Sequence, residues 1–174
     1  MLIELARVED ARAIAEVHVA SWQAAYRGLL PEGYLASLSI AEREARWRRD
    51  IESGQAWVLV VRAREGQVLG LAAYGASRDD DAPAQRGELQ AIYLHPAHWG
   101  QGMGRALCRA ALQDLAKKEF TSAGLWVIEG NDRAIRFYER VGFVCEPDSR
   151  KAFELGGVSL HELRYRCALP APHL

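Results

Sequence analysis

Three glycines at alternate positions, Gly100, Gly102 and Gly104, separate a strand-like segment from a helix-like one. Residues 87–94 before them resemble a strand that stops at Pro96, and the apolar residues after them recur at helical spacing. Backbone without side chains can curl with its amides inward and adopt positive φ. Because a helix N-terminus carries partial positive charge, the sequence predicts a turn that binds a diphosphate. A plain strand-to-helix connection is the alternative.

Two better-known phosphate loops do not match this turn. A P-loop ends in Gly-Lys-Ser or Gly-Lys-Thr, whereas Gly104 is followed by Arg105. A dinucleotide-binding fingerprint needs a third glycine three places after the second, where Arg105 stands, and an acidic ribose partner downstream. We therefore expect neither a magnesium–nucleotide site nor a dinucleotide site.

The remaining hydrophobic pattern predicts an α/β fold with a mixed, mostly antiparallel sheet and helices on its faces. The expected strands are 2–8, 56–63, 68–76, 87–94, 123–128, 143–155 and 158–169. Four helices are expected: one after Asp10, one over 40–52 behind a Ser39–Glu42 capping box, one after the glycine turn, and one between Asn131 or Asp132 and Gly142. The strand–helix–strand unit over 87–128 requires parallel pairing, whereas the hairpins at both ends are antiparallel.

Length and charge limit the classes of function. A chain of 174 residues with 49% apolar residues suits one domain, 1–174, and a net charge of −1 argues against nucleic-acid or membrane binding. The three cysteines, Cys108, Cys145 and Cys167, form no CxxC pair and have no histidines at ligand spacing, so we expect reduced thiols and no metal. We find no signal peptide and no membrane-spanning stretch, and expect a cytoplasmic protein.

Two sequence blocks carry a resemblance to a known family. The run 94–107 (LHPAHWGQGMGRAL) closely resembles the coenzyme A signature of the GNAT superfamily of N-acetyltransferases. A second block resembles the family's fifth strand and following helix, at Leu125-Trp126-Val127, Asn131, Ala134, Phe137-Tyr138 and Gly142-Phe143. The resemblance implies a GNAT-like fold, acetyl-CoA as co-substrate, and a small-molecule or peptide amine as acceptor. Homodimers are common in the superfamily.

The resemblance also implies which residues hold the coenzyme. They are Ile92, Tyr93, Leu94, Trp99, Gly100, Gln101, Gly102, Met103, Gly104, Arg105 and Asn131, although Asn131 could be only a helix cap. Trp99 departs from the family, which usually has Arg or Gln at the first signature position. Because backbone amides supply most of the phosphate binding, we expect the site to survive this change and its affinity to differ.

Two side chains are candidates for acid–base chemistry. An amine must lose a proton before it attacks a thioester, and by resemblance Glu88 lies on the strand beside the thioester and could accept that proton. Tyr138 matches the family's usual acid for the leaving sulfur. A solvated glutamate and a core tyrosine are the alternatives. Backbone N–H groups of Ile92 to Leu94 could stabilise the oxyanion if the strand bulges there as in the family.

The acceptor pocket is less defined. The run 21–31 (SWQAAYRGLLP) looks like a bacterial branch of the superfamily in which this region lines that pocket, so Trp22 and Tyr26 are candidate substrate-binding residues; simple helix packing is the alternative. The Asp79-Asp80-Asp81 loop is a weak hint of a cationic acceptor. Cys108 lies in a helix body without an adjacent base, and we expect it in the core.

The sequence therefore predicts direct acetyl transfer from acetyl-CoA to a primary amine in a ternary complex. Two rival functions remain. One is a non-catalytic module that binds or senses acyl-CoA. The other is an acyltransferase with a different donor or acceptor.

Overall fold

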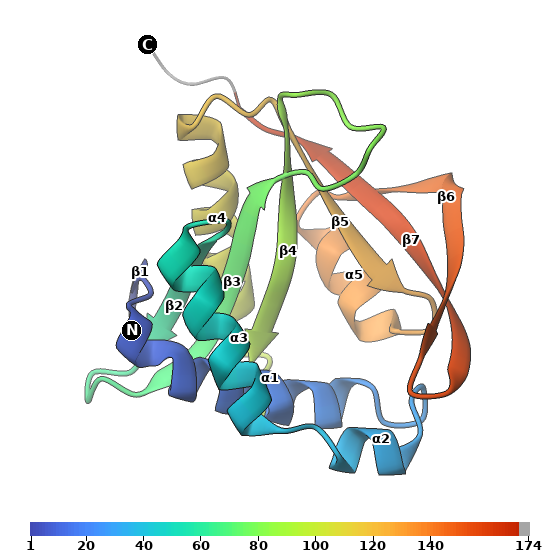
Figure 1. The fold of residues 1–174 in the computed structure, drawn as a ribbon. Helices are drawn as coiled ribbons and strands as arrows, with labels where there is room; N and C mark the ends of the chain where they lie inside the picture. Colours follow the sequence, from blue (N-terminus) through green and yellow to red (C-terminus); the bar gives the residue numbers. More distant parts are fainter. Residues whose placement is uncertain (171–174) are drawn as a thin grey trace.

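The computed structural model describes residues 1–170 and contains one seven-stranded sheet (Figure 1). The strands are β1 Leu2–Leu5, β2 Trp57–Arg62, β3 Val68–Ala76, β4 Arg86–Leu94, β5 Ser122–Ile128, β6 Val144–Leu155 and β7 Val158–Ala168. Their order in the sheet is β1-β2-β3-β4-β5-β7-β6. Only β4 and β5 pair in parallel, and all other neighbours are antiparallel. The predicted mixed, mostly antiparallel sheet is confirmed.

The described part of the chain has five α-helices, one more than expected. They are α1 Ala11–Ala25, α2 Glu32–Ala36, α3 Ile40–Ser53, α4 Met103–Lys117 and α5 Asp132–Arg140, with 3-10 turns over Val8–Asp10 and Pro96–His98. The extra helix, α2, has only five residues and begins after Pro31, too short for a hydrophobic period to show in the sequence. Within residues 1–170 no helix is long and apolar enough to cross a membrane.

Local capping follows the residue types. Ser39 Oγ accepts the backbone N–H of Glu42 at 3.2 Å, and Gly54 takes a left-handed conformation that ends α3. Asn131 Oδ1 accepts the backbone N–H of Ala134 at 3.2 Å, so Asn131, and not Asp132, caps α5. The first strand is shorter than expected because a 3-10 turn begins at residue 8.

Helices cover both faces of the sheet. In the view of Figure 1, α1 and α3 lie in front of β2–β4, while α4 and α5 lie behind. Alternate residues of β2 and β3 supply the two cores: Val60 and Leu71 pack with Ile14 of α1 on one face, and Val61 packs with Leu107 of α4 on the other. The central strands, which lie beside the glycine turn that follows β4, are therefore buried on both faces.

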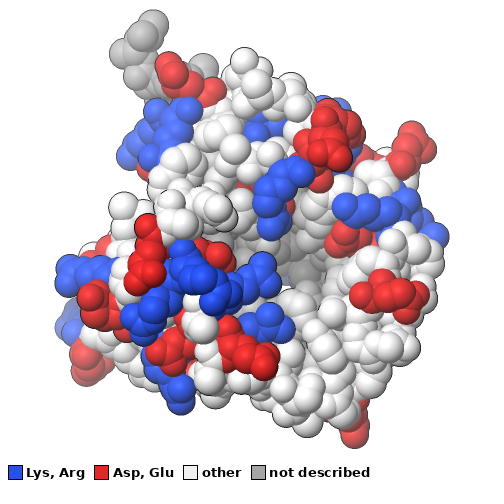
Figure 2. All heavy atoms as spheres, viewed as in Figure 1, with Lys and Arg blue, Asp and Glu red and all other residues white. Residues whose placement is uncertain are grey.

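Charges on the surface are mixed in sign. On the face viewed in Figure 2, basic and acidic side chains are interleaved, and this face is hollowed near its centre, between α3 and the β6–β7 hairpin. A face of this kind offers no extended positive surface to a polyanion.

Candidate active site

The glycine turn has the conformation that its residues allow. Gly100 and Gly102 have φ of 77° and 81°, in the left-handed region, and Gly102 is the N-cap of α4. A Cβ built on either glycine would meet nothing within 4 Å. Glycine is therefore favoured there by the positive φ of the backbone, and not by a lack of space. Gly104 serves packing instead, because its Cβ would lie 3.2 Å from Leu94 Cδ1 and 3.4 Å from Phe137 Cε2. The turn thus presents open backbone at a helix N-terminus.

Strands β4 and β5 separate beside this turn. Their parallel pairing covers only Arg86–Glu88 against Ser122–Gly124, and beyond these residues the strands diverge (Figure 1). Strand β5 then pairs with β7 along its whole length. The two diverging strands form a fork whose backbone groups are free of their usual neighbour.

The bulge in β4 lies earlier than expected. Ile92–Leu94 pair regularly with β3, whereas Gln90 is the extra residue between Leu89 and Ala91, which have consecutive partners on β3. A bulge bends its strand and increases the local twist, so the bulge at Gln90 occurs where β4 leaves β5. The condition set for Ile92–Leu94, a bulge at these residues as in the family, is therefore not met, and no residue type in the strand marks the position of the bulge.

A cavity of about 400 Å³ occupies the fork and is named here the fork cavity. The sequence-predicted site residues that line it are Trp22, Tyr26, Ile92, Tyr93, Leu94, Trp99, Gly100, Gly102, Gly104, Arg105, Asn131 and Tyr138. The structure thus brings together residues from α1, β4, the glycine turn, α4 and α5. Trp126, Arg133, Phe137 and Arg140 also line it and were not predicted as site residues.

Three predicted site residues lie outside the lining. Gln101 is exposed, and its Nε2 donates to the carbonyl of Ala97 at 3.2 Å, which braces the turn. Met103 packs against the core behind the sheet. Glu88 is buried in the sheet at the base of the fork. Gln101 and Met103 therefore support the glycine turn without facing the cavity.

Aromatic rings form the wall of the cavity on the α1 side. The ring centroids of Trp22 and Tyr26 lie 4.9 Å apart, and Trp22 meets the ring of Tyr93 at 6.5 Å. His18 stacks on Tyr93 at 4.5 Å, and its Nδ1 accepts the indole N–H of Trp47 at 3.1 Å. Trp22 and Tyr26 therefore pack on other rings and line the cavity at the same time.

His18 is expected to make the stability of the protein depend on pH. Burial, aided by nearby Arg43 and Arg46, lowers the pKa of His18 from 6.5 to about 3, so the folded state keeps it neutral. The unfolded chain binds the proton first, and stability is lost as pH falls below the unfolded value. Between about pH 8 and about pH 5 the loss is about 2 kcal/mol. Urea denaturation at both pH values measures it.

His18→Gln is the test variant for this linkage, because the glutamine side chain is polar, close in size to histidine and does not titrate. The difference in unfolding free energy between wild type and His18→Gln should shrink by that amount at the lower pH. An identical pH slope in wild type and His18→Gln contradicts the prediction.

Asn131, the N-cap of α5, and Tyr138, in the body of α5, both line the cavity. Burial raises the pKa of Tyr138 well above its usual value, so the hydroxyl stays protonated at neutral pH. Its ring packs against Phe137 at 5.3 Å and Phe143 at 6.0 Å. Asn131 is 8% exposed and both caps α5 and lines the cavity. Tyr138 thus combines a core ring with a hydroxyl available as a donor.

Glu88 is held in an ion pair. Only 3% of the residue is exposed, and its Oε2 accepts the backbone N–H of Arg78 at 2.9 Å. The guanidinium of Arg78 also donates to both carboxylate oxygens of Glu88. The alternative of a solvated glutamate is therefore wrong. The Arg78 side chain is 61% exposed, so the ion pair borders solvent on the Arg78 side.

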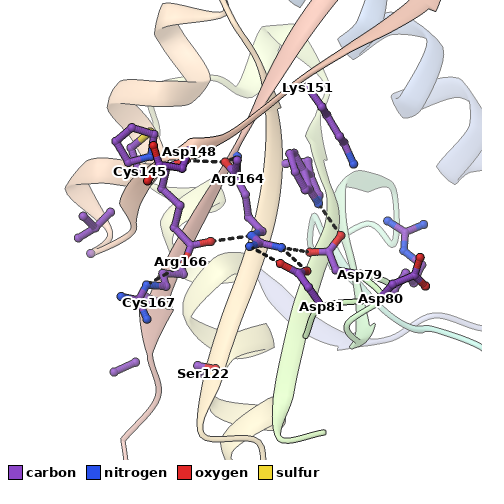
Figure 3. Close-up of a pocket in the computed structure, with 18 residues that line it drawn as sticks. Asp79, Asp80, Asp81, Ser122, Cys145, Asp148, Lys151, Arg164, Arg166 and Cys167 are labelled. Atoms are coloured by element: carbon purple, nitrogen blue, oxygen red, sulfur yellow. Dashed lines mark hydrogen bonds and ion pairs between the residues drawn. The ribbon is translucent and has the colours of Figure 1, made fainter. Parts of the chain in front are cut away.

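A second hollow, of about 1220 Å³, lies on the sheet face opposite α5, and we name it the Arg164 hollow (Figure 3). Arg164 of β7 is 13% exposed and pairs with Asp79 at 3.1 Å and Asp81 at 2.7 Å. Asp79 also accepts the indole N–H of Trp126 at 2.9 Å, and the ammonium of Lys151 lies 3.5 Å from the centroid of that ring. Trp126 lines both hollows. The aspartate loop is thus tied to β7 by charge pairs.

Positive groups gather at the mouth of the fork cavity. Arg105 lies in the first turn of α4 and Arg133 in the first turn of α5, although helix dipoles favour acidic residues there. Arg140 lines the same cavity. Within residues 1–170 none of the three forms an ion pair. Unpaired cations and two helix N-termini favour an anionic ligand at this mouth.

The Cys108 thiol is not placed to act as a nucleophile. Cys108 is fully buried in α4, and burial raises the pKa of its thiol to about 12, so it stays protonated. Over residues 1–170 no group of three or more His, Cys, Asp or Glu side chains is arranged to hold a metal ion.

Comparisons with known proteins agree on one family. A model described as the acetyltransferase (GNAT) family matches residues 19–143. The uncharacterized N-acetyltransferase YuaI of Bacillus subtilis is 37% identical over 158 residues, which cover 91% of this chain and 87% of YuaI.

Solved structures share the fold. One is the PaiA N-acetyltransferase of Thermoplasma acidophilum in complex with coenzyme A, with a TM-score of 0.73, 22% identity and coverage of 97% and 99% of the two chains. Another is the putative acetyltransferase yncA of Salmonella typhimurium with acetyl-CoA, with a TM-score of 0.74, 22% identity and coverage of 100% and 96%. The chain belongs to the GNAT family and is an acyltransferase.

Proposed function

We propose that this chain, acting as one domain over residues 1–174, transfers an acetyl group from acetyl-CoA directly to a primary amine in a ternary complex. One observation carries the proposal: the fork cavity joins an open glycine turn at a helix N-terminus to the free edge of β4. The glycine turn suits the anionic phosphates of the coenzyme, and the free edge of β4 suits its extended thioester arm.

The coenzyme end of the cavity suits a pyrophosphate. Backbone N–H groups around Gly100 to Gly104 and the dipole of α4 attract anionic oxygens, and Arg105 adds a positive charge in the same turn. The pantetheine arm then follows β4 at Ile92–Leu94, with the Asn131 amide on the opposite wall. This arrangement directs the thioester toward Tyr138.

The reaction needs a proton acceptor and a proton donor. The neutral amine nitrogen attacks the thioester carbonyl carbon, and free N–H groups of β4 stabilise the oxyanion. The carbon–sulfur bond then breaks, and the sulfur takes a proton from the Tyr138 hydroxyl. The amine's proton passes to Glu88 through one water and from Glu88 to solvent, and solvent restores the proton of Tyr138. The products are an N-acetylated amine and free coenzyme A.

The acceptor is proposed to enter from the face of the Arg164 hollow. Trp126 lines both this hollow and the fork cavity, and Trp22 and Tyr26 supply aromatic wall beside the thioester end. Aromatic faces attract ammonium groups, as the Lys151 ammonium over Trp126 illustrates. A small-molecule or peptide amine suits this entry.

A panel of amines tests the function. Thiol release from acetyl-CoA is followed with polyamines, amino acids, peptides and aminoglycosides, while calorimetry measures coenzyme binding alone. Acetyl-CoA binding with amine-dependent thiol release supports the proposal. Binding without turnover on any amine favours an acyl-CoA sensor, and faster turnover with a longer acyl-CoA favours a different donor. No binding of coenzyme A rejects the whole assignment.

Glu88→Gln tests the proposed base. The amide preserves the shape of the side chain but cannot accept a proton, so kcat should fall by about a hundredfold with the Kd for acetyl-CoA unchanged. Steady-state kinetics measures kcat, and calorimetry measures the Kd for acetyl-CoA.

Arg78→Ala separates catalysis from the ion pair. If Glu88 is the base, removing its partner leaves kcat within about threefold. Equal losses in Arg78→Ala and Glu88→Gln would mean that the ion pair itself matters and that Glu88 is not the base.

A further inference from the structure

Trp99 is fixed at the mouth of the fork cavity. Its indole N–H donates to the carbonyl of Leu94 at 2.9 Å, which ties the start of the glycine turn to the end of β4. The ring itself lines the cavity. The hydrogen bond uses the only polar atom of the side chain, so the exposed face of the ring is left as an apolar, π-electron surface.

Arg133 of α5 occupies this surface. Its guanidinium carbon lies 3.8 Å from the centroid of the Trp99 ring, the distance of a stacked cation–π pair. A guanidinium that stacks by its face keeps its N–H edges free to donate. The two residues lie far apart in the sequence. Trp99 precedes α4 and Arg133 lies in the first turn of α5, so the starts of these two helices bring them together.

The stability of α5 does not explain why residue 133 is an arginine. Arg133 is the second residue of α5, where the helix dipole disfavours positive charge. It forms no ion pair with any residue in the range 1–170, and although the residue is exposed, its guanidinium packs on Trp99, and desolvation lowers its pKa. An unpaired, partly desolvated cation beside a cavity is stabilised by an anionic ligand.

We propose that Arg133, held in place by stacking on Trp99, binds a phosphate group of the coenzyme. This inference rests on the proposed function, since it assumes that coenzyme A occupies the fork cavity. Trp99 is then a positioning residue: it fixes the guanidinium plane at the mouth and contributes no charge. Coenzyme A carries two sources of phosphate chemistry, the pyrophosphate and the ribose 3′-phosphate.

Calorimetry with free coenzyme A and dephospho-coenzyme A tests the contact. Arg133→Ala should raise the Kd for coenzyme A by about tenfold, the loss of one charge-assisted hydrogen bond. The matched control is Arg136→Ala, an exposed arginine one turn later on α5 that does not line the cavity, and it should leave the Kd unchanged. Dephospho-coenzyme A lacks only the 3′-phosphate.

The two ligands distinguish the phosphates. If the penalty of Arg133→Ala disappears with dephospho-coenzyme A, the partner is the 3′-phosphate; if it persists, the partner is the pyrophosphate. Both results support the contact. Equal affinities of Arg133→Ala and Arg136→Ala overturn it, and so does tighter binding by Arg133→Ala, which would mean that the arginine blocks an adenine from stacking on Trp99.

A double-mutant cycle tests the positioning role of Trp99. In the Trp99→Leu background the further loss from Arg133→Ala should fall to about twofold, because the guanidinium is no longer held. Full additivity of the two losses would reject that role. Wild-type protein that binds no coenzyme A would refute the proposed function, whereas wild-type binding with an inert Arg133 refutes this inference alone.

Discussion

Gly102→Val should weaken the binding of acetyl-CoA by about a thousandfold. Residue 102 has a φ of 81°, and a β-branched side chain cannot hold that conformation without strain. The backbone is expected to rotate, which turns the amides of the turn away from the phosphate oxygens. Loss of two hydrogen bonds to a charged group accounts for an effect of this size. Calorimetry with acetyl-CoA measures it.

The control for this variant is Gly66→Val, in the hairpin between β2 and β3. Gly66 has a φ of 91°, and a Cβ there also meets nothing within 4 Å. The two variants therefore carry similar backbone strain, and each should lose about 1–2 kcal/mol of stability. Gly66→Val should bind acetyl-CoA as the wild type does. A similar loss of binding in both variants would mean that strain and general destabilisation cause it.

Regular elements could be predicted from sequence because their signals are local. Strand 68–76 and the start of β7 can be predicted at the residues where the structure has them, since apolar Val, Leu and Tyr residues mark the first and the Gly156-Gly157 turn marks the second. Helix α2 and the bulge at Gln90 were missed. A five-residue helix is shorter than two turns, and a bulge in β4 depends on how its partner strand pairs.

The site could be predicted only in part for the same reason. The glycine turn and Tyr138 fall within contiguous blocks, and the resemblance pointed to them directly. The pairing of Arg164 with the aspartate loop, and the stacking of Arg133 on Trp99, join segments that are distant in the sequence. Neither contact leaves a local pattern, so a sequence could at most suggest an arginine in a first helical turn that lacks an acidic partner.

Tyr138→Phe tests the proposed acid and should lower kcat by on the order of a thousandfold. The hydroxyl keeps its proton at neutral pH because burial raises its pKa, so the wild type has a donor for the departing sulfur there. Without it the thiolate must leave unprotonated into a partly apolar cavity. The ring still packs on Phe137 and Phe143, so the fold should remain.

Tyr138→Phe should lower the rate of acetyl transfer without changing the affinity for acetyl-CoA. Tyr138→Phe should bind acetyl-CoA with the wild-type Kd, because the lost hydroxyl interacts with the sulfur only as the carbon–sulfur bond breaks. Tyr165→Phe makes the same chemical change at another tyrosine of the core behind the sheet, which does not line the fork cavity, and should keep the wild-type rate. Single-turnover acetyl transfer measures the step itself. A Tyr138→Phe protein that acetylates amines at the wild-type rate would remove Tyr138 from the chemistry and leave it a core residue.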